Sequence, residues 1–393
     1  MKNRNILISG ASIAGPALAY WLSRHGFNPT VVERAPALRD GGYAVDFRGA
    51  SMQALERMGL LGEVRRAQTH MGAVTFVNGD DKPVASLPSE FMSGEVEILR
   101  GDLARILYEA SRQGTEYLFG DSITSLTQDE QGVRVTFQHA PPRTFALVVG
   151  ADGLHSNVRA LAFGDESRFV HDLGYYVSIF TAPNLLNLDY AGRFYTEPGR
   201  TVGVYSARQN TESKVMLVFA SPPLKYDRHD SARQKQLLAN AFAGAGWETS
   251  RILEAMWDAP DFYFDSISQV RMDSWSNGRT VLLGDAAYCA SPLSGMGTGL
   301  AVVGAYVLAG ELAAAAGDHR TAFARYEEQM RGYVQQCQKQ GQDGGAFFVP
   351  ESHAMLWFRN QLYRSMSWVP WKGLIARMAM RAGNAISLKE YPA

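Results

Sequence analysis

The stretch "ILISGASIAGPALAYWL", residues 6–22, contains a glycine-rich turn on which the rest of the fold depends. From Gly10 to Gly15 it reads GASIAG, a variant of the G-x-G-x-x-G turn in which Ser12 replaces the middle glycine. Glycines in such a turn let the backbone approach a pyrophosphate at the N-terminus of the next helix. A secretory signal is the alternative, because Arg4 precedes an uncharged apolar run.

The residues after this stretch favour the nucleotide-binding interpretation. We expect a strand over 5–9, a helix over 13–25 and a second, β-branched strand over 29–33. Glu33 ends that strand about 20 residues beyond the first glycine, the spacing at which a carboxylate binds ribose hydroxyls in dinucleotide-binding βαβ units. A cleaved signal would lead into unrelated sequence, so we expect the segment to be part of the working protein.

Composition describes an ordinary globular protein. The 393 residues are 46% hydrophobic and 20% charged, with a formal net charge of -1. This balance gives no reason to expect nucleic acid or a membrane as partner. The two cysteines, Cys289 and Cys337, provide neither a disulfide framework nor a metal-ligand spacing. We therefore expect a cytoplasmic protein without a metal site.

Two distant stretches repeat the pattern of strand, glycine-aspartate turn and helix. Residues 147–163 read LVVGADGLHSNVRALAF, and residues 280–312 read TVLLGDAAYCASPLSGMGTGLAVVGAYVLAGEL. With the first turn and Glu33, they resemble the three fingerprints of the flavoprotein aromatic hydroxylases of the p-hydroxybenzoate hydroxylase fold. GADGxxSxVR is matched at every fixed position, and GDAAxxxxPxxGxGxxxA is matched from Gly284 to Ala301.

The resemblance implies an α/β fold with a Rossmann-like FAD-binding domain and an inserted antiparallel-sheet substrate domain. We place the FAD-binding domain at residues 1–170 and 276–350, and the substrate domain at 171–275. Residues 351–393 are expected to form a C-terminal helix that bridges the two domains. This tail is basic and apolar and is interrupted at Pro370, so contact with a membrane surface is an alternative.

The resemblance also assigns cofactor-binding residues. Asp285 is expected to hold flavin ribityl or ribose hydroxyls, and the turn after it to face the flavin ring. Arg100 fits the arginine that contacts FAD, and Asp46 fits an aspartate that does so in the tetracycline-inactivating members. Asp152 is expected to serve both FAD and the nicotinamide donor. The complete FAD set is Gly10, Ser12, Ile13, Ala14, Gly15, Glu33, Arg34, Asp46, Arg100, Asp152, Gly284, Asp285, Pro292, Gly295, Met296 and Gly297.

Arg39 and Arg48 are the candidates for binding NADPH or NADH, which these enzymes use as a transient co-substrate. In the family, an antiparallel sheet covers the substrate pocket above the flavin. The candidates that line it here are Tyr176, Ser178, Phe180, Arg193, Phe194 and Tyr205, an aromatic-rich set suited to a flat apolar molecule.

The resemblance implies a monooxygenase in which NAD(P)H reduces FAD and O2 forms a C4a-hydroperoxyflavin that hydroxylates an aromatic or polycyclic substrate. The flavin supplies the chemistry, so we assign no catalytic side chain. We expect a monomer or weak homodimer. A flavin-dependent reductase, a halogenase of the same fold and a non-catalytic FAD-binding module are the alternatives.

Overall fold

The computed structural model describes residues 4–39, 41–88, 94–366 and 382–391. Its first layer is a six-stranded sheet that is parallel except at the edge strand β17. The order is β17 (Ser276–Asn277), β18 (Thr280–Leu282), β11 (Leu147–Gly150), β1 (Asn5–Ser9), β2 (Asn28–Glu33) and β7 (Glu116–Phe119). Ile6, Leu7 and Ile8 are completely buried, as expected of a parallel strand covered on both faces. The N-terminal segment is thus built into the core.

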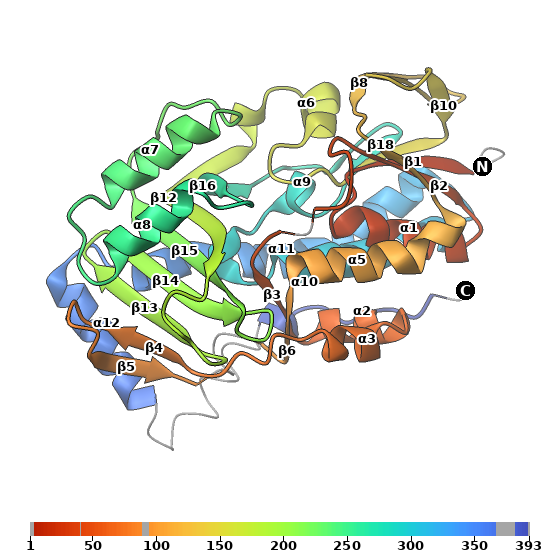
Figure 1. Cartoon of the computed structure of the whole chain (residues 1–393). Coiled ribbons are helices and arrows are strands. Elements are labelled where there is room, and N and C mark those ends of the chain that lie inside the picture. The colour runs from red at the N-terminus through yellow and green to blue at the C-terminus, as the bar shows by residue number, and fades with distance from the viewer. Residues whose placement is uncertain (1–3, 40, 89–93, 367–381, 392–393) are drawn as a thin grey trace.

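Helices bury the apolar strands of this sheet; the first helix contacts the sheet directly, and the others pack on that helix or on one another (Figure 1). They are α1 (Ala14–Arg24), α2 (Ala50–Arg57), α3 (Leu61–Arg66), α5 (Arg100–Ser111), α10 (Gly297–Ala314) and α11 (His319–Phe348). The first strand, helix and second strand lie within one residue of their expected bounds. α10 is long and apolar enough to cross a membrane, but 78% of it is buried inside the protein, where it contacts α1, α2 and α11. Its apolar sequence reflects its place in the core.

The second layer is a seven-stranded sheet with strand order β16 (Tyr263–Val270), β12 (Val170–Pro183), β15 (Glu212–Ala220), β14 (Arg200–Ala207), β13 (Gly192–Glu197), β4 (Val74–Val77) and β5 (Pro83–Leu87). Five of these strands come from the expected substrate domain. β4 and β5 come from the first half of the chain, and β4 pairs in parallel with β13. The boundary expected at residue 171 therefore leaves two strands out of this sheet, because they occur 80 or more residues earlier in the sequence.

The two faces of the second sheet have different partners. On one face lie α7 (Ser231–Ala241) and α8 (Thr249–Trp257), whose Leu238 and Ile252 join the buried cluster formed with that face (Figure 1). The opposite face packs against the end of α11 and against Tyr43 and Leu293 of the first unit. That second face is therefore the inner one, at the contact between the two layers.

The C-terminal segment contacts both layers. α12 (His353–Met366) lies along β5 and β13 of the second sheet (Figure 1). Residues 382–391 return to the first unit, where the Tyr391 hydroxyl donates to Glu311 Oε1 at 2.8 Å. Residues 367–381, with the expected interruption at Pro370, lie outside the described residues.

Smaller elements complete the chain. They are β3 (Ala44–Phe47) with β6 (Val96–Leu99), the three-stranded sheet of β8 (Ile123–Gln128), β9 (Val133–Phe137) and β10 (Arg143–Phe145), and the helices α6 (Asn157–Phe163), α9 (Asp285–Tyr288), η1 (Arg112–Gly114), η2 (Glu166–Arg168) and η3 (Pro292–Ser294). The architecture confirms the expected α/β fold.

Candidate functional site

The turn between β1 and α1 has no room for a side chain at Gly10 or at Gly15, the first and last glycines of the motif. Gly10 has φ of +106°, and a Cβ there would lie 2.4 Å from the carbonyl oxygen of Ala151. A Cβ on Gly15 would lie 1.9 Å from the carbonyl oxygen of Gly10. No described side chain caps α1, and its first turn carries no acidic residue. Its free N–H groups therefore suit an anion such as a pyrophosphate.

Glu33 closes this turn from the end of β2. Its carboxylate accepts hydrogen bonds from the backbone N–H groups of Ala11 and Ala35, both at 2.9 Å. Arg39 lies 3.6 Å from the same carboxylate, and Arg34 is exposed next to it. The structure therefore places Arg39 beside the expected ribose-binding carboxylate, and this position does not support a direct contact with a nicotinamide ring.

Arg100 joins the glycine turn to a second loop. Its guanidinium donates to the Ser12 hydroxyl at 2.9 Å and to the carbonyl of Gly41 at 3.4 Å. A Cβ on Gly42, whose φ is +125°, would lie 2.6 Å from Arg100 Nε. The Gly41-Gly42 pair thus lets the backbone approach the arginine closely. Ser12, the residue that departs from the motif, supplies an acceptor for this cation.

Asp46 and Arg48 form an ion pair at 3.1 Å. Burial raises the pKa of Asp46 to about 7 and the negative charge of Glu97 adds to the effect, while Arg48 opposes it. A Cβ on Gly295 would lie 3.9 Å from Asp46 Oδ2, so this carboxyl faces the third motif. Arg48 is only 8% exposed and its charge is directed to Asp46. That burial does not support the expected role in binding NAD(P)H.

Asp152 uses its carboxylate within the protein. It accepts hydrogen bonds from the Ser9 hydroxyl at 3.2 Å, from the Val158 N–H at 3.1 Å and from the Ser156 hydroxyl. Burial raises its pKa, and these hydrogen bonds oppose the shift. The geometry indicates that Asp152 holds the start of α6 against β1. Its expected roles toward FAD and the nicotinamide donor stay predictions.

The second and third motifs are joined by a completely buried arginine. Arg159 donates to the carbonyl of Ala286 at 2.9 Å and to that of Leu154 at 2.6 Å. This contact explains why two turns more than 100 residues apart in the sequence carry fixed residues. The arginine sets the position of one turn relative to the other.

The third motif presents a line of accessible residues in an otherwise buried segment. Asp285, Pro292 and Gly295 are exposed, whereas Gly284 and residues 286–291 are buried. A Cβ on Gly297 would lie 3.7 Å from Asp285 Oδ1. Surrounding protein raises the pKa of Asp285 and Arg100 opposes the shift, so the carboxyl is reachable by solvent but deep in the molecule. Asp285 is thus a carboxyl surrounded by protein but open to a bound molecule.

The start of α10 follows directly on these accessible residues. Met296 is buried and precedes the helix, which no described side chain caps and whose first turn has no acidic residue. The N-terminus of α10 therefore provides unpaired N–H groups beside Gly295. A negatively charged ring edge placed there would be stabilised.

The structure divides the expected substrate residues between the two faces of the second sheet. Phe194 packs with Phe348 on the inner face, and the Tyr205 hydroxyl accepts from the Ala44 N–H at 3.1 Å. Both therefore point toward the first unit, as the interpretation of a substrate pocket requires.

The other four candidates point away. Tyr176 and Phe180 belong to the buried cluster under α7 and α8, and Ser178 shares their side of β12. Arg193 pairs with Asp81 at the surface. These four side chains lie on the outer face of the sheet or at the surface. Both faces of β12 are apolar, so alternation alone does not tell which residues face the first unit.

The inner face contains residues that the sequence did not single out. Val177 and Ile179 of β12 form a cluster with Ile267 and pack against Leu293, which belongs to the third motif. The carbonyl of Tyr43 accepts a hydrogen bond from the Arg100 N–H at 3.0 Å, and burial raises the pKa of its phenol to about 12. Only the strand register across β12 and β16 reveals which residues share this face.

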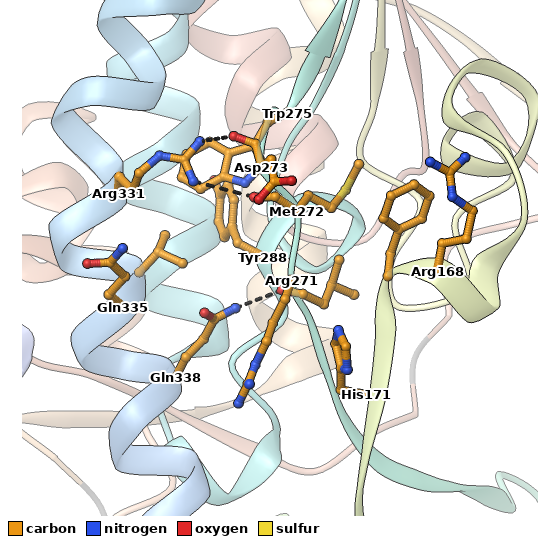
Figure 2. A pocket seen from close by; sticks show the side chains of 13 residues that line it. Arg168, His171, Arg271, Met272, Asp273, Trp275, Tyr288, Arg331, Gln335 and Gln338 are labelled. Atoms are coloured by element: carbon orange, nitrogen blue, oxygen red, sulfur yellow. Dashed lines mark hydrogen bonds between the residues drawn. The ribbon is translucent and has the colours of Figure 1, made fainter.

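A separate hollow of about 470 Å³ lies between α11 and the end of β16 (Figure 2). Arg331 spans its wall and donates to the carbonyls of Asp273 and Met272, and Gln338 donates to the carbonyl of Val270 (Figure 2). Of the three motifs, only Tyr288 reaches it. These hydrogen bonds connect α11 to β16 and the residues that follow it. The hollow is separate from the glycine turns and Asp285 described above.

Comparison with known proteins agrees with this geometry. Residues 3–340 match the family model of the FAD binding domain. The chain is 48% identical over 341 residues to protein Rv1260 of Mycobacterium tuberculosis, with 85% of this chain and 92% of the relative covered. It is 40% identical over 345 residues to a flavin-dependent monooxygenase of Legionella longbeachae, with 86% and 88% covered. The crystal structure of the tetracycline destructase Tet(55) superimposes with a TM-score of 0.86 at 38% identity and covers 99% of each chain.

Proposed function

This chain belongs to the flavin-dependent monooxygenases that share the FAD binding domain, and from that premise we propose that it hydroxylates a polycyclic aromatic or enolic small molecule with NAD(P)H and O2. The contact between Leu293 and the inner face of the second sheet carries the proposal. It supports an arrangement in which the turn expected to hold the flavin ring is covered directly by the sheet expected to hold the substrate.

The residues present fit FAD. The Gly10–Gly15 turn and the free N-terminus of α1 suit the pyrophosphate, and Glu33 suits a ribose. Asp285 suits the ribityl hydroxyls, and the uncapped start of α10 suits the ring edge that carries negative charge. When bound, the flavin would take electrons from NAD(P)H and activate O2. The protein's own part is to position the substrate ring and exclude water.

The substrate class is inferred from the inner face and from the similarity to Tet(55). That face combines apolar side chains such as Val177 and Ile179 with aromatic Phe194. Such a surface suits a flat, multi-ring molecule. We also infer a cytoplasmic location, since both cysteines are free and buried. A monomer or weak homodimer stays a prediction.

The test is an oxygen-transfer assay on the yellow, FAD-loaded protein. NADPH oxidation, O2 uptake and H2O2 release are followed with tetracycline, anthraquinone and simple phenol panels under 18O2. Substrate-stimulated oxidation with one 18O atom in the product supports the proposal. A product without 18O would indicate a reductase, and no oxidation in any panel would indicate a binding module.

A further inference from the structure

His155, in the second motif, is held between two carboxylates. Its Nδ1 lies 3.0 Å from Glu166 Oε1, and its Nε2 lies 2.9 Å from Asp265 Oδ2. A neutral imidazole has one donor and one acceptor nitrogen, whereas ionised carboxylates only accept. Both contacts are hydrogen bonds only when both nitrogens carry protons. His155 is therefore an imidazolium in this arrangement.

Asp265 connects that cation to the second sheet. It lies on β16 and is only 6% exposed. Besides the contact with His155, it accepts from the backbone N–H of Ser266 at 2.8 Å and from the Tyr263 hydroxyl at 3.2 Å. In its contact with the His155 imidazolium the carboxylate acts only as an acceptor. An ionised carboxylate has no proton to offer, so the tyrosine hydroxyl must be the donor.

Tyr263 lies on the inner face of the sheet. It pairs with Ile179 across β12 and β16, and residues directly opposite in an antiparallel pair point to the same side. Its phenol is near enough to Tyr43 and Cys289 for their charges to act on it, and Cys289 belongs to the third motif. The residue is 44% exposed although the sheet around it is buried. Tyr263 is the first residue of the edge strand β16, so its partly exposed side chain lies at the edge of the inner face.

The hydrogen-bonding polarity of Tyr263 follows from these contacts. A tyrosine hydroxyl has one proton and two lone pairs. The Tyr263 hydroxyl donates its proton to Asp265, so its oxygen can only accept a hydrogen bond from a molecule bound at this face. A bound ligand with an O–H group at this point gains a hydrogen bond, and a ligand with only an ether or carbonyl oxygen does not.

We propose that Tyr263 is a specificity-determining residue that accepts a hydrogen bond from a phenolic or enolic hydroxyl of the substrate, and that Asp265 and His155 are positioning residues that fix this polarity. The inference deepens the proposed function and rests on it. It narrows the substrate class to ring systems that carry a free hydroxyl group.

Equilibrium binding to the FAD-loaded enzyme tests the proposal without turnover. The probes are 2-naphthol and 2-methoxynaphthalene, which differ in whether their oxygen carries a proton, and binding is followed by the perturbation of the flavin absorbance. In Tyr263→Phe, the preference for the naphthol over the ether should fall by about 3- to 10-fold relative to wild type, the worth of one hydrogen bond. Tyr176→Phe, on the opposite face of neighbouring β12, should keep the wild-type preference.

Asp265→Asn tests the positioning role with nearly the same shape. The amide NH2 can donate to the Tyr263 oxygen. The Tyr263 hydroxyl can then donate its own proton to the ligand, and this change favours binding of the ether probe. The naphthol preference should therefore fall in this variant too, whereas a purely structural defect would weaken both probes equally.

An unchanged preference in Tyr263→Phe, equal weakening of both probes, or no binding of either probe to wild type would overturn the proposal. Failure of the proposed function is seen separately, as absence of 18O in any product.

Discussion

The ion-paired His155 makes the stability of the protein depend on pH in a defined window. Burial alone would lower the pKa of this imidazole, but hydrogen bonds to Asp265 and Glu166 raise it from 6.5 to about 9. Below pH 6.5 the residue is protonated in both the folded and the unfolded chain, and its stabilising effect is fully present. As the pH rises from 6.5 through 9 the effect is lost, because first the unfolded and then the folded chain releases the proton.

The difference between these two pKa values corresponds to about 3 kcal/mol in the free energy of unfolding. The His155 side chain is 28% exposed, so solvent screening makes this an upper value. We expect His155→Gln to be less stable than wild type at pH 6, and the gap to shrink by up to about 3 kcal/mol at pH 9.5. Urea unfolding at both pH values in excess FAD measures the gap.

His229→Gln is the matched control. His229 also contacts a carboxylate, that of Asp227 at 3.2 Å, but its side chain is 77% exposed. This variant should follow wild type at both pH values. The reasoning is refuted if the difference in unfolding free energy between wild type and His155→Gln stays constant from pH 6 to 9.5. A constant difference would mean that His155 is uncharged in the folded protein.

Four further substitutions have definite outcomes. Gly10→Val and Gly15→Val should give colourless protein, since each added side chain would meet a carbonyl oxygen in the turn. Retained absorbance near 450 nm would contradict this expectation. The control Gly332→Val, at a position with open space, should stay yellow. Ser12→Gly should stay yellow and weaken FAD binding by no more than about tenfold, the worth of its hydrogen bond with Arg100, as read by fluorescence titration. Phe180→Ala should lower the free energy of unfolding in urea by about 3–5 kcal/mol, because this side chain lies in the core under α7 and α8. The KM for substrate should stay unchanged, and a changed KM would indicate that Phe180 lines the substrate pocket.

The sequence predicts the first unit well because its turns depend on local sterics. The glycine at position 10 is required by its positive φ and by the approach of Ala151, and such a requirement is visible as a motif. The same holds for the two glycine-aspartate turns. Their contact through Arg159 adds a reason for the fixed arginine that the motif alone does not give.

The orientation of β12 could not be predicted in the same way. Tyr176 and Phe180 are buried under helices, and Val177 and Ile179 are buried against the first unit. Alternation identifies the inner face only when one face is polar, and here both are covered. The contacts of His155 were equally hidden, since Asp265 lies 110 residues away in the sequence.

The contribution of β4 and β5 to the second sheet has a consequence for how the chain folds. β4 cannot pair with β13 until β13 has been synthesised, more than 100 residues later in the chain. Until then β4 and β5 form a two-stranded hairpin, which has only marginal stability by itself. A fragment cut at residues 171 and 275 would leave the outer edge of β13 unpaired and prone to aggregate. The sheet that we expect to select the substrate is therefore no portable module. Grafting it between relatives requires moving residues 74–87 as well, and the two layers should unfold together.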